Sequence, residues 1–129
     1  MESSAKKKVA VYIRIANENQ DILAHHIKTM KKYVDDHPDW ELVCIHSDIA
    51  SSARLSKRIG LAKLIQGARE GKYTVVVIPS PSMLSRSPLP HHKLLTKLEE
   101  AGATIEYADG SQVKQLKLLM QIMKAARGD

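Results

Sequence analysis

The chain has 129 residues, of which 43% are hydrophobic and 26% are charged, a balance that favours one folded domain and excludes a wholly disordered chain. No apolar run reaches the length of a membrane span, and the lysine-rich start lacks an apolar stretch of signal-peptide length, so we expect a cytoplasmic protein without membrane contact. Cys44 is the only cysteine, which excludes an internal disulfide framework. Twenty Lys and Arg residues against 14 Asp and Glu residues give a net charge of +6, which favours an anionic partner.

Apolar runs typical of buried strands alternate with segments of helical periodicity, the pattern of an α/β domain with a mainly parallel sheet. The first run predicts a strand over residues 8–15, and a helix is predicted over residues 19–36, ending before Pro38. The apolar face of this helix is expected to consist of Ile22, Leu23, His26, Ile27, Met30 and Val34. A second strand is predicted over residues 41–46.

The middle of the chain continues this alternation. Residues 48–57 form a predicted polar loop, and a helix over residues 59–70 and a strand over residues 73–78 follow it. This strand is almost entirely β-branched, which predicts a place at the centre of the sheet. Prolines exclude a regular helix or a central strand over residues 79–88. The last expected elements are a helix over residues 90–101, a strand over residues 104–108 and a terminal helix from residue 111.

The terminal helix carries a broad apolar stripe. Its members are Val113, Leu116, Leu119, Met120, Ile122, Met123 and Ala126. A helix of this kind either packs on its own sheet or meets a partner helix, and the sequence leaves both arrangements open.

Arg14 is the most unusual residue of the first strand, because it interrupts a continuous apolar run. A strand of this type is buried on both faces, where an unpaired charge costs on the order of several kcal/mol. Arg14 therefore either forms an ion pair inside the fold or lies at the end of the strand and holds an anion such as phosphate, which its planar guanidinium suits.

Three polar segments are expected to converge at the carboxyl ends of the strands, where open α/β sheets bind ligands. They comprise residues 14–17, 48–58 and 79–86. Their side chains include Arg14, Asp48, Ser51, Ser52, Arg54, Arg58, Ser85 and Arg86. Such a cluster suits a phosphodiester, because arginines neutralise charge on a phosphoryl centre.

At these residues the sequence resembles the catalytic domain of the serine recombinases, the resolvase and invertase family. The resemblance rests on three blocks, in order: Tyr12-Ile13-Arg14-Ile15-Ala16, then Asp48 and Ser51 with Arg58-Ile59-Gly60-Leu61, then Leu84-Ser85-Arg86. It covers about residues 8–126.

The resemblance implies a resolvase-like three-layer fold with a dimerisation helix at its C-terminal end, so that residues 1–110 form the catalytic domain and residues 111–129 begin the interface helix. It implies double-stranded DNA as the partner, and a homo-oligomer, dimer or tetramer, through residues 111–126. We expect neither a cofactor nor a metal, because the adjacent pairs His25-His26 and His91-His92 lack the i, i+4 spacing of helical metal ligands. The catalytic residues that it assigns are Arg14, Asp48, Ser51, Arg58 and Arg86, and the DNA-contacting residues are Arg54, Lys114, Lys117 and Lys124.

Two departures from the family pattern bear on activity. Ala16 stands where the family has the serine that attacks DNA, and a methyl group offers no nucleophilic oxygen. Ser82-Met83 replaces an Asp-Arg pair, which removes a carboxylate and a guanidinium from the site. We therefore expect a domain that is inactive or impaired in strand cleavage and exchange.

Other interpretations remain open at this point. Ser51 or Ser85 could supply a substitute hydroxyl, although nucleophile placement tolerates little error. The chain could instead be a non-catalytic dimerisation or regulatory module of a recombinase system, or a small-anion binder on a flavodoxin-like sheet. The resemblance also favours a fragment of a longer recombinase-like protein.

Overall fold

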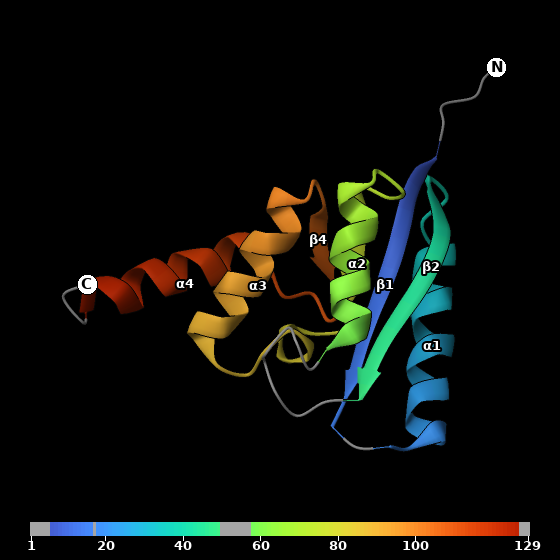
Figure 1. Cartoon of the computed structure of the whole chain (residues 1–129), viewed down its shortest axis with the longest axis horizontal. Helices are drawn as coiled ribbons and strands as arrows, with labels where there is room; N and C mark the ends of the chain where they lie inside the picture. Colours follow the sequence, from blue (N-terminus) through green and yellow to red (C-terminus); the bar gives the residue numbers. More distant parts are fainter. Residues whose placement is uncertain (1–5, 17, 50–57, 127–129) are drawn as a thin grey trace.

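Four parallel strands form the centre of the computed structural model, which describes residues 6–16, 18–49 and 58–126. The strands are β1 (Lys7–Ile15), β2 (Trp40–Ile49), β3 (Val75–Ile78) and β4 (Thr104–Tyr107), and their order in the sheet is β2-β1-β3-β4 (Figure 1). All three neighbouring pairs are parallel. The predicted α/β class is confirmed, and β3 lies inside the sheet as its β-branched sequence indicated.

Helices cover both faces of this sheet, giving the expected three layers (Figure 1). The helix α1 (Gln20–Asp35) lies on one face, and α2 (Ile59–Arg69) and α3 (Pro88–Glu100) lie on the other. A short 3-10 turn, η2 (Pro81–Met83), precedes α3, and α4 (Val113–Ala126) projects away from the body of the domain. None of the described helices is long and apolar enough to cross a membrane.

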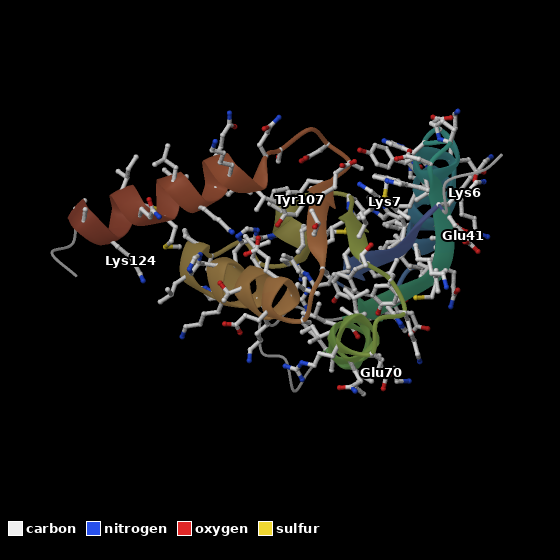
Figure 2. All side chains as sticks on the ribbon, turned by 90° about the horizontal axis from the view of Figure 1, so that it is seen from above. Lys6, Lys7, Glu41, Glu70, Tyr107 and Lys124 are labelled. Carbon is white, nitrogen blue, oxygen red and sulfur yellow. The ribbon has the colours of Figure 1, made fainter. Side chains whose placement is uncertain are left out.

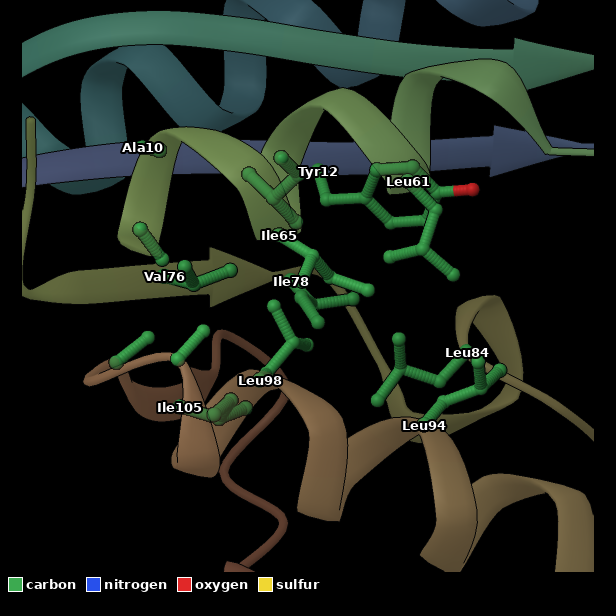
Figure 3. Close-up of a cluster of buried hydrophobic side chains, with 14 of the residues drawn as sticks. Ala10, Tyr12, Leu61, Ile65, Val76, Ile78, Leu84, Leu94, Leu98 and Ile105 are labelled. Carbon is green, nitrogen blue, oxygen red and sulfur yellow. The ribbon is translucent and has the colours of Figure 1, made fainter. Parts of the chain in front are cut away.

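The strand β1 is buried on both faces. Residues 9–13 are 0% exposed. Ala10 and Tyr12 belong to the cluster beneath α2 and α3 (Figure 3), whereas Val9, Val11 and Ile13 belong to the cluster beneath α1. The continuous apolar run predicted this double burial, because a strand covered by helices on both sides has no solvated face.

The strand β2 extends three residues beyond its predicted end. Its register with β1 continues through Arg14↔Asp48 to Ile15↔Ile49. Asp48 therefore lies in a strand and not in the predicted loop, because the hydrogen-bonded ladder with β1 holds polar residues in extended conformation. The helix α3 also begins earlier than predicted, at Pro88, since proline is tolerated in the first helical turn.

The predicted apolar face of α1 is correct only in part. Met30 and Val34 are buried, but Ile22 is 45% exposed. The first turn of α1 lies beyond the ends of β1 and β2, so the sheet does not cover this side chain (Figure 1).

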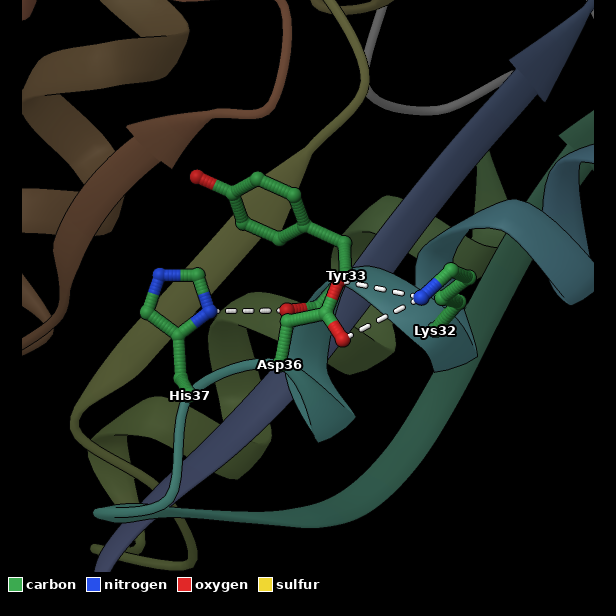
Figure 4. A network of polar contacts seen from close by, with 4 residues as sticks. All are labelled: Lys32, Tyr33, Asp36 and His37. Carbon is green, nitrogen blue, oxygen red and sulfur yellow. Dashed lines mark hydrogen bonds and ion pairs between the residues drawn. The ribbon is translucent and has the colours of Figure 1, made fainter.

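Polar contacts join residues of the last turn of α1 to each other and to His37 (Figure 4), and an aromatic contact links His37 to the start of β2. His37 Nδ1 donates to the carbonyl oxygen of Tyr33 at 2.7 Å, and the His37 ring stacks on Trp40 with centroids 3.9 Å apart. Lys32 pairs with Asp36 at 3.2 Å. Burial, followed by a hydrogen bond to Glu106, raises the pKa of Tyr33 to about 12. Trp40, the first residue of β2, is half-buried at the edge of the core.

Candidate functional site

The carboxyl ends of β1, β2 and β3 meet at one edge of the sheet, which we call the rim. Arg14 is the penultimate residue of β1, with Asp48 opposite it on β2. Arg58 directly precedes α2, and residues 79–86 follow β3. The structure thus brings together Arg14, Asp48, Arg58 and the segment that carries Arg86.

Asp48 connects three elements at the rim. Its Oδ1 accepts the backbone N–H of Gly60 at 2.6 Å, and its Oδ2 accepts the N–H of Leu61 at 2.8 Å. Oδ2 also accepts the Tyr12 hydroxyl at 2.7 Å. A carboxylate in this place satisfies two of the free N–H groups that begin a helix and interacts favourably with the helix dipole. Asp48 therefore ties β2 to both α2 and β1.

The Gly60 backbone passes so close to β2 that no side chain fits there. A Cβ atom on Gly60 would lie 2.4 Å from the carbonyl oxygen of Ser47. The next residue, Leu61, is 0% exposed in the core. These contacts give a physical reason for the spacing Arg58-Ile59-Gly60-Leu61, in which glycine permits the close approach and leucine anchors the helix.

Arg58 is 0% exposed, a rare environment for a guanidinium. Its Nε and Nη2 donate to the Tyr12 hydroxyl at 3.0 and 2.9 Å. Nη2 also donates to the carbonyl oxygen of Met83 at 2.5 Å, and Nη1 donates to that of Leu84. These acceptors compensate for the loss of water around the charge.

Tyr12 is the centre of this network, and sequence reasoning did not assign it a role. Its hydroxyl donates to Asp48 and accepts from Arg58. Burial, followed by the hydrogen bond to Asp48, raises the pKa of Tyr12, so the hydroxyl keeps its proton. The available signal was the i, i+2 spacing of Tyr12 and Arg14, which places both side chains on the same face of a strand.

Arg14 contacts the same segment as Arg58. Its Nε donates to the carbonyl oxygen of Met83 at 3.1 Å, and its Nη2 donates to that of Ser82 at 2.7 Å. Its backbone N–H donates to Met83 Sδ at 3.4 Å. Burial, followed by the nearby charge of Arg58 and with a smaller contribution from Arg86, lowers the pKa of Arg14. The guanidinium of Arg14 thus lies close enough to those of Arg58 and Arg86 to be repelled by both.

The remaining predicted residues are placed less centrally. Ala16 is exposed just after β1, and Arg86 is exposed, with no hydrogen bond or ion pair to it within the described ranges.

The predicted DNA-contacting lysines lie on α4. Lys117 pairs with Glu99 at 2.8 Å and so joins α4 to α3. Two further predicted residues, Lys114 and Lys124, are exposed on α4, where Figure 2 shows Lys124 near its far end. Three predicted rim residues, Ser51, Ser52 and Arg54, lie outside the described residues.

An apolar cleft of about 300 Å³ adjoins the rim. One wall is formed by residues 81–88 together with α3, and α4 forms the other. Within the part of the chain that the structure describes, no cluster of three or more His, Cys, Asp or Glu side chains is arranged to hold a metal ion.

The comparisons with known proteins agree with the α/β fold. The model of the family described as "Resolvase, N terminal domain" matches residues 9–127. The N-terminal catalytic domain of TP901-1 integrase has 21% sequence identity and a TM-score of 0.77, with 95% of both chains covered. A resolvase family site-specific recombinase from Streptococcus pneumoniae has 21% identity and a TM-score of 0.71, covering 95% of this chain and 87% of that chain.

A third solved structure, a serine recombinase from Sulfolobus solfataricus, has 22% identity and a TM-score of 0.65, again covering 95% of this chain and 87% of that one. A search of proteins with curated functions gives no match. At these identities the likeness concerns the fold.

Proposed function

Because the chain belongs to the resolvase N-terminal domain family, we propose that it is a recombinase-type domain that binds DNA phosphates at the rim and does not form a covalent serine linkage to DNA. The observation that carries this proposal is that Arg14, Arg58 and the segment of Arg86 meet at the rim, while Ala16 follows Arg14 by two residues at the place where the resemblance puts the nucleophile. Guanidinium groups that repel one another gain most from an anion between them.

The chemistry of strand cleavage fails at two places. Ala16 has no oxygen that could attack a phosphodiester. In addition, Ser82 and Met83 lack the carboxylate and guanidinium of the family pattern, and one missing donor to a transition state commonly costs about 3 kcal/mol. The two losses compound, so the domain retains phosphate-binding groups without the means to break the bond.

Ser85 does not replace the missing nucleophile in this proposal. Its Oγ accepts the backbone N–H of Ser87 at 3.1 Å, as in a turn that begins a helix. No basic side chain among its described partners would take the hydroxyl proton, which an attacking serine requires. We assign Ser85 to the local structure at the start of α3.

Charge reversal at Arg86 tests the DNA-binding part of the proposal. We expect Arg86→Glu to weaken binding to a duplex of about 20 base pairs by roughly tenfold or more at low salt, because a phosphate contact becomes a repulsion. Fluorescence anisotropy at several salt concentrations measures this change. Arg69→Glu is the matched control, since Arg69 is also exposed but lies at the end of α2 that is farther from the rim. Equal affinities of the two variants would contradict a phosphate site at the rim.

We propose in addition that α4 is a dimerisation surface, so that residues 1–110 form the phosphate-binding part and residues 111–129 belong to the interface helix. Met120 is buried against the domain, but Leu118, Leu119 and Ile122 are between 52% and 57% exposed. One of these exposed residues, Leu119, also lines the cleft beside α3. A second copy of the chain would cover both features.

A substitution on α4 tests the dimer. We expect the wild-type domain to have the mass of a dimer in analytical ultracentrifugation, and Ile122→Glu to have the mass of a monomer, because a buried interface does not tolerate an unpaired charge. Gln121→Glu adds the same charge at the neighbouring exposed position and should leave the dimer intact. A monomeric wild type, or an equal mass for both variants, would contradict this interface.

The second candidate function is a regulator that pairs with an active recombinase through the same helix. The exposed apolar row of α4 favours it, because such a surface can join an unlike partner as well as a like one. Mixing the domain with an active family member and measuring the mass of the mixture separates the two cases. A mixed species supports the regulator, whereas separate species exclude it.

A further inference from the structure

We infer that residues 82–84 act as an internal substitute for phosphate, a clasp that holds Arg14 and Arg58 until phosphate oxygens displace its carbonyl groups. This inference rests on the proposed phosphate site at the rim and adds its regulation. The clasp consists of the three consecutive carbonyl oxygens of Ser82, Met83 and Leu84, all of which accept hydrogen bonds from the two guanidinium groups.

The donors of Arg58 are almost fully used by its present partners. A guanidinium has five N–H groups. Four of them point to acceptors, two to the Tyr12 hydroxyl and one each to the carbonyls of Met83 and Leu84. Bidentate binding of a phosphate needs two parallel N–H groups. Arg58 can therefore bind phosphate in that way only if it gives up at least one existing partner.

The Met83 carbonyl oxygen is shared between the two arginines. It accepts from Arg14 Nε at 3.1 Å and from Arg58 Nη2 at 2.5 Å. Two positive groups that converge on one oxygen are arranged as they would be around a phosphate oxygen. A neutral carbonyl neutralises their charge less well than an anionic oxygen does, so the exchange of partners favours the phosphate.

The segment also carries the group that a phosphate meets first. Arg86 follows Leu84 by two residues and is exposed, whereas Leu84 is 0% exposed in the core. Leu84 thus anchors the segment while Arg86 reaches solvent. A phosphate bound at Arg86 lies beside the clasp and can compete for the donors of Arg14 and then Arg58.

Nuclear magnetic resonance of arginine side chains in the wild-type domain tests this order of events. With ¹⁵N-labelled arginine, we expect the Arg14 Nε–H and Arg58 Nη–H signals of the free protein to exchange slowly with water. Addition of duplex DNA should shift the signals of Arg86, Arg14 and Arg58 and increase the exchange of the Arg58 Nη–H groups by roughly tenfold, because opening a hydrogen bond exposes its hydrogen to water. The signals are assigned with single Arg→Lys variants, and exposed Arg69 serves as the internal control.

The outcomes separate the clasp from the binding site. A shift of Arg86 alone, with Arg14 and Arg58 unchanged in position and exchange, would overturn the clasp and leave the phosphate site in place. Unchanged signals of all three arginines would overturn the phosphate site and the clasp with it. A parallel titration with inorganic phosphate should reproduce the shifts of Arg14 and Arg58 if the phosphate group alone displaces the carbonyls. If neither DNA nor inorganic phosphate shifts the signals of Arg14 and Arg58, the inference is overturned.

Discussion

Replacement of Arg58 by alanine is expected to lower the free energy of unfolding by about 3 to 5 kcal/mol, since it leaves buried acceptors without donors and opens a cavity. The acceptors are the Tyr12 hydroxyl and the carbonyls of Met83 and Leu84. Arg58 is 0% exposed, so water reaches these groups poorly after the side chain is removed. Urea denaturation followed by circular dichroism measures the loss.

Two further variants show whether the loss comes from the network. Arg58→Lys keeps the charge but replaces a planar fork by a single ammonium group, which cannot reach acceptors on both sides at once, so an intermediate loss is expected. Arg69→Ala removes an exposed arginine of α2 and should change stability by less than about 0.5 kcal/mol. Equal, small effects of Arg58→Ala and Arg69→Ala would show that the buried network contributes little.

Gly60→Ala is the second substitution with a large expected effect, about 3 kcal/mol of lost stability. The added Cβ would lie 2.4 Å from the Ser47 carbonyl oxygen, which is backbone in a paired strand and cannot rotate away. The start of α2 must therefore shift, and the hydrogen bonds from Gly60 and Leu61 to Asp48 weaken with it.

The same denaturation experiment with Ile59→Ala provides the comparison for Gly60→Ala. Ile59 is the preceding residue and is 67% exposed, so its truncation should cost less than about 0.5 kcal/mol. If Gly60→Ala were as stable as Ile59→Ala, the close approach of α2 to β2 would not explain the glycine.

The fold was predictable wherever burial produces a periodic pattern. The apolar run of β1 predicted burial on both faces, and residues 9–13 are all fully buried. Ile22 and Asp48 were misplaced because their positions depend on where the neighbouring elements end. The length of β2 is fixed by its pairing with β1, and the local sequence of β2 does not show how far that pairing extends.

The candidate site was predictable as a collection of side chains but not as a network. The convergence of Arg14 and Arg58 followed from the expectation that polar segments meet at the carboxyl ends of parallel strands. Arg14 and Arg58 both donate to backbone carbonyls of residues 82–84, which every residue type supplies and which no sequence pattern distinguishes. The burial of Arg58 likewise depends on tertiary packing around a residue whose type favours exposure.

Ala16→Ser adds a hydroxyl at the proposed nucleophile position and separates the two causes that we propose for inactivity. Covalent linkage to DNA in this variant would mean that the nucleophile alone is lacking. No linkage would mean that Ser82 and Met83 also prevent the reaction.

The central claim is that the domain holds DNA phosphates without attacking them. The most direct measurement is incubation of the wild-type domain with supercoiled DNA, followed by denaturation and analysis for nicked DNA and for protein covalently joined to DNA. We predict intact supercoiled DNA and no covalent adduct, whereas an adduct formed by the wild-type chain would contradict the account.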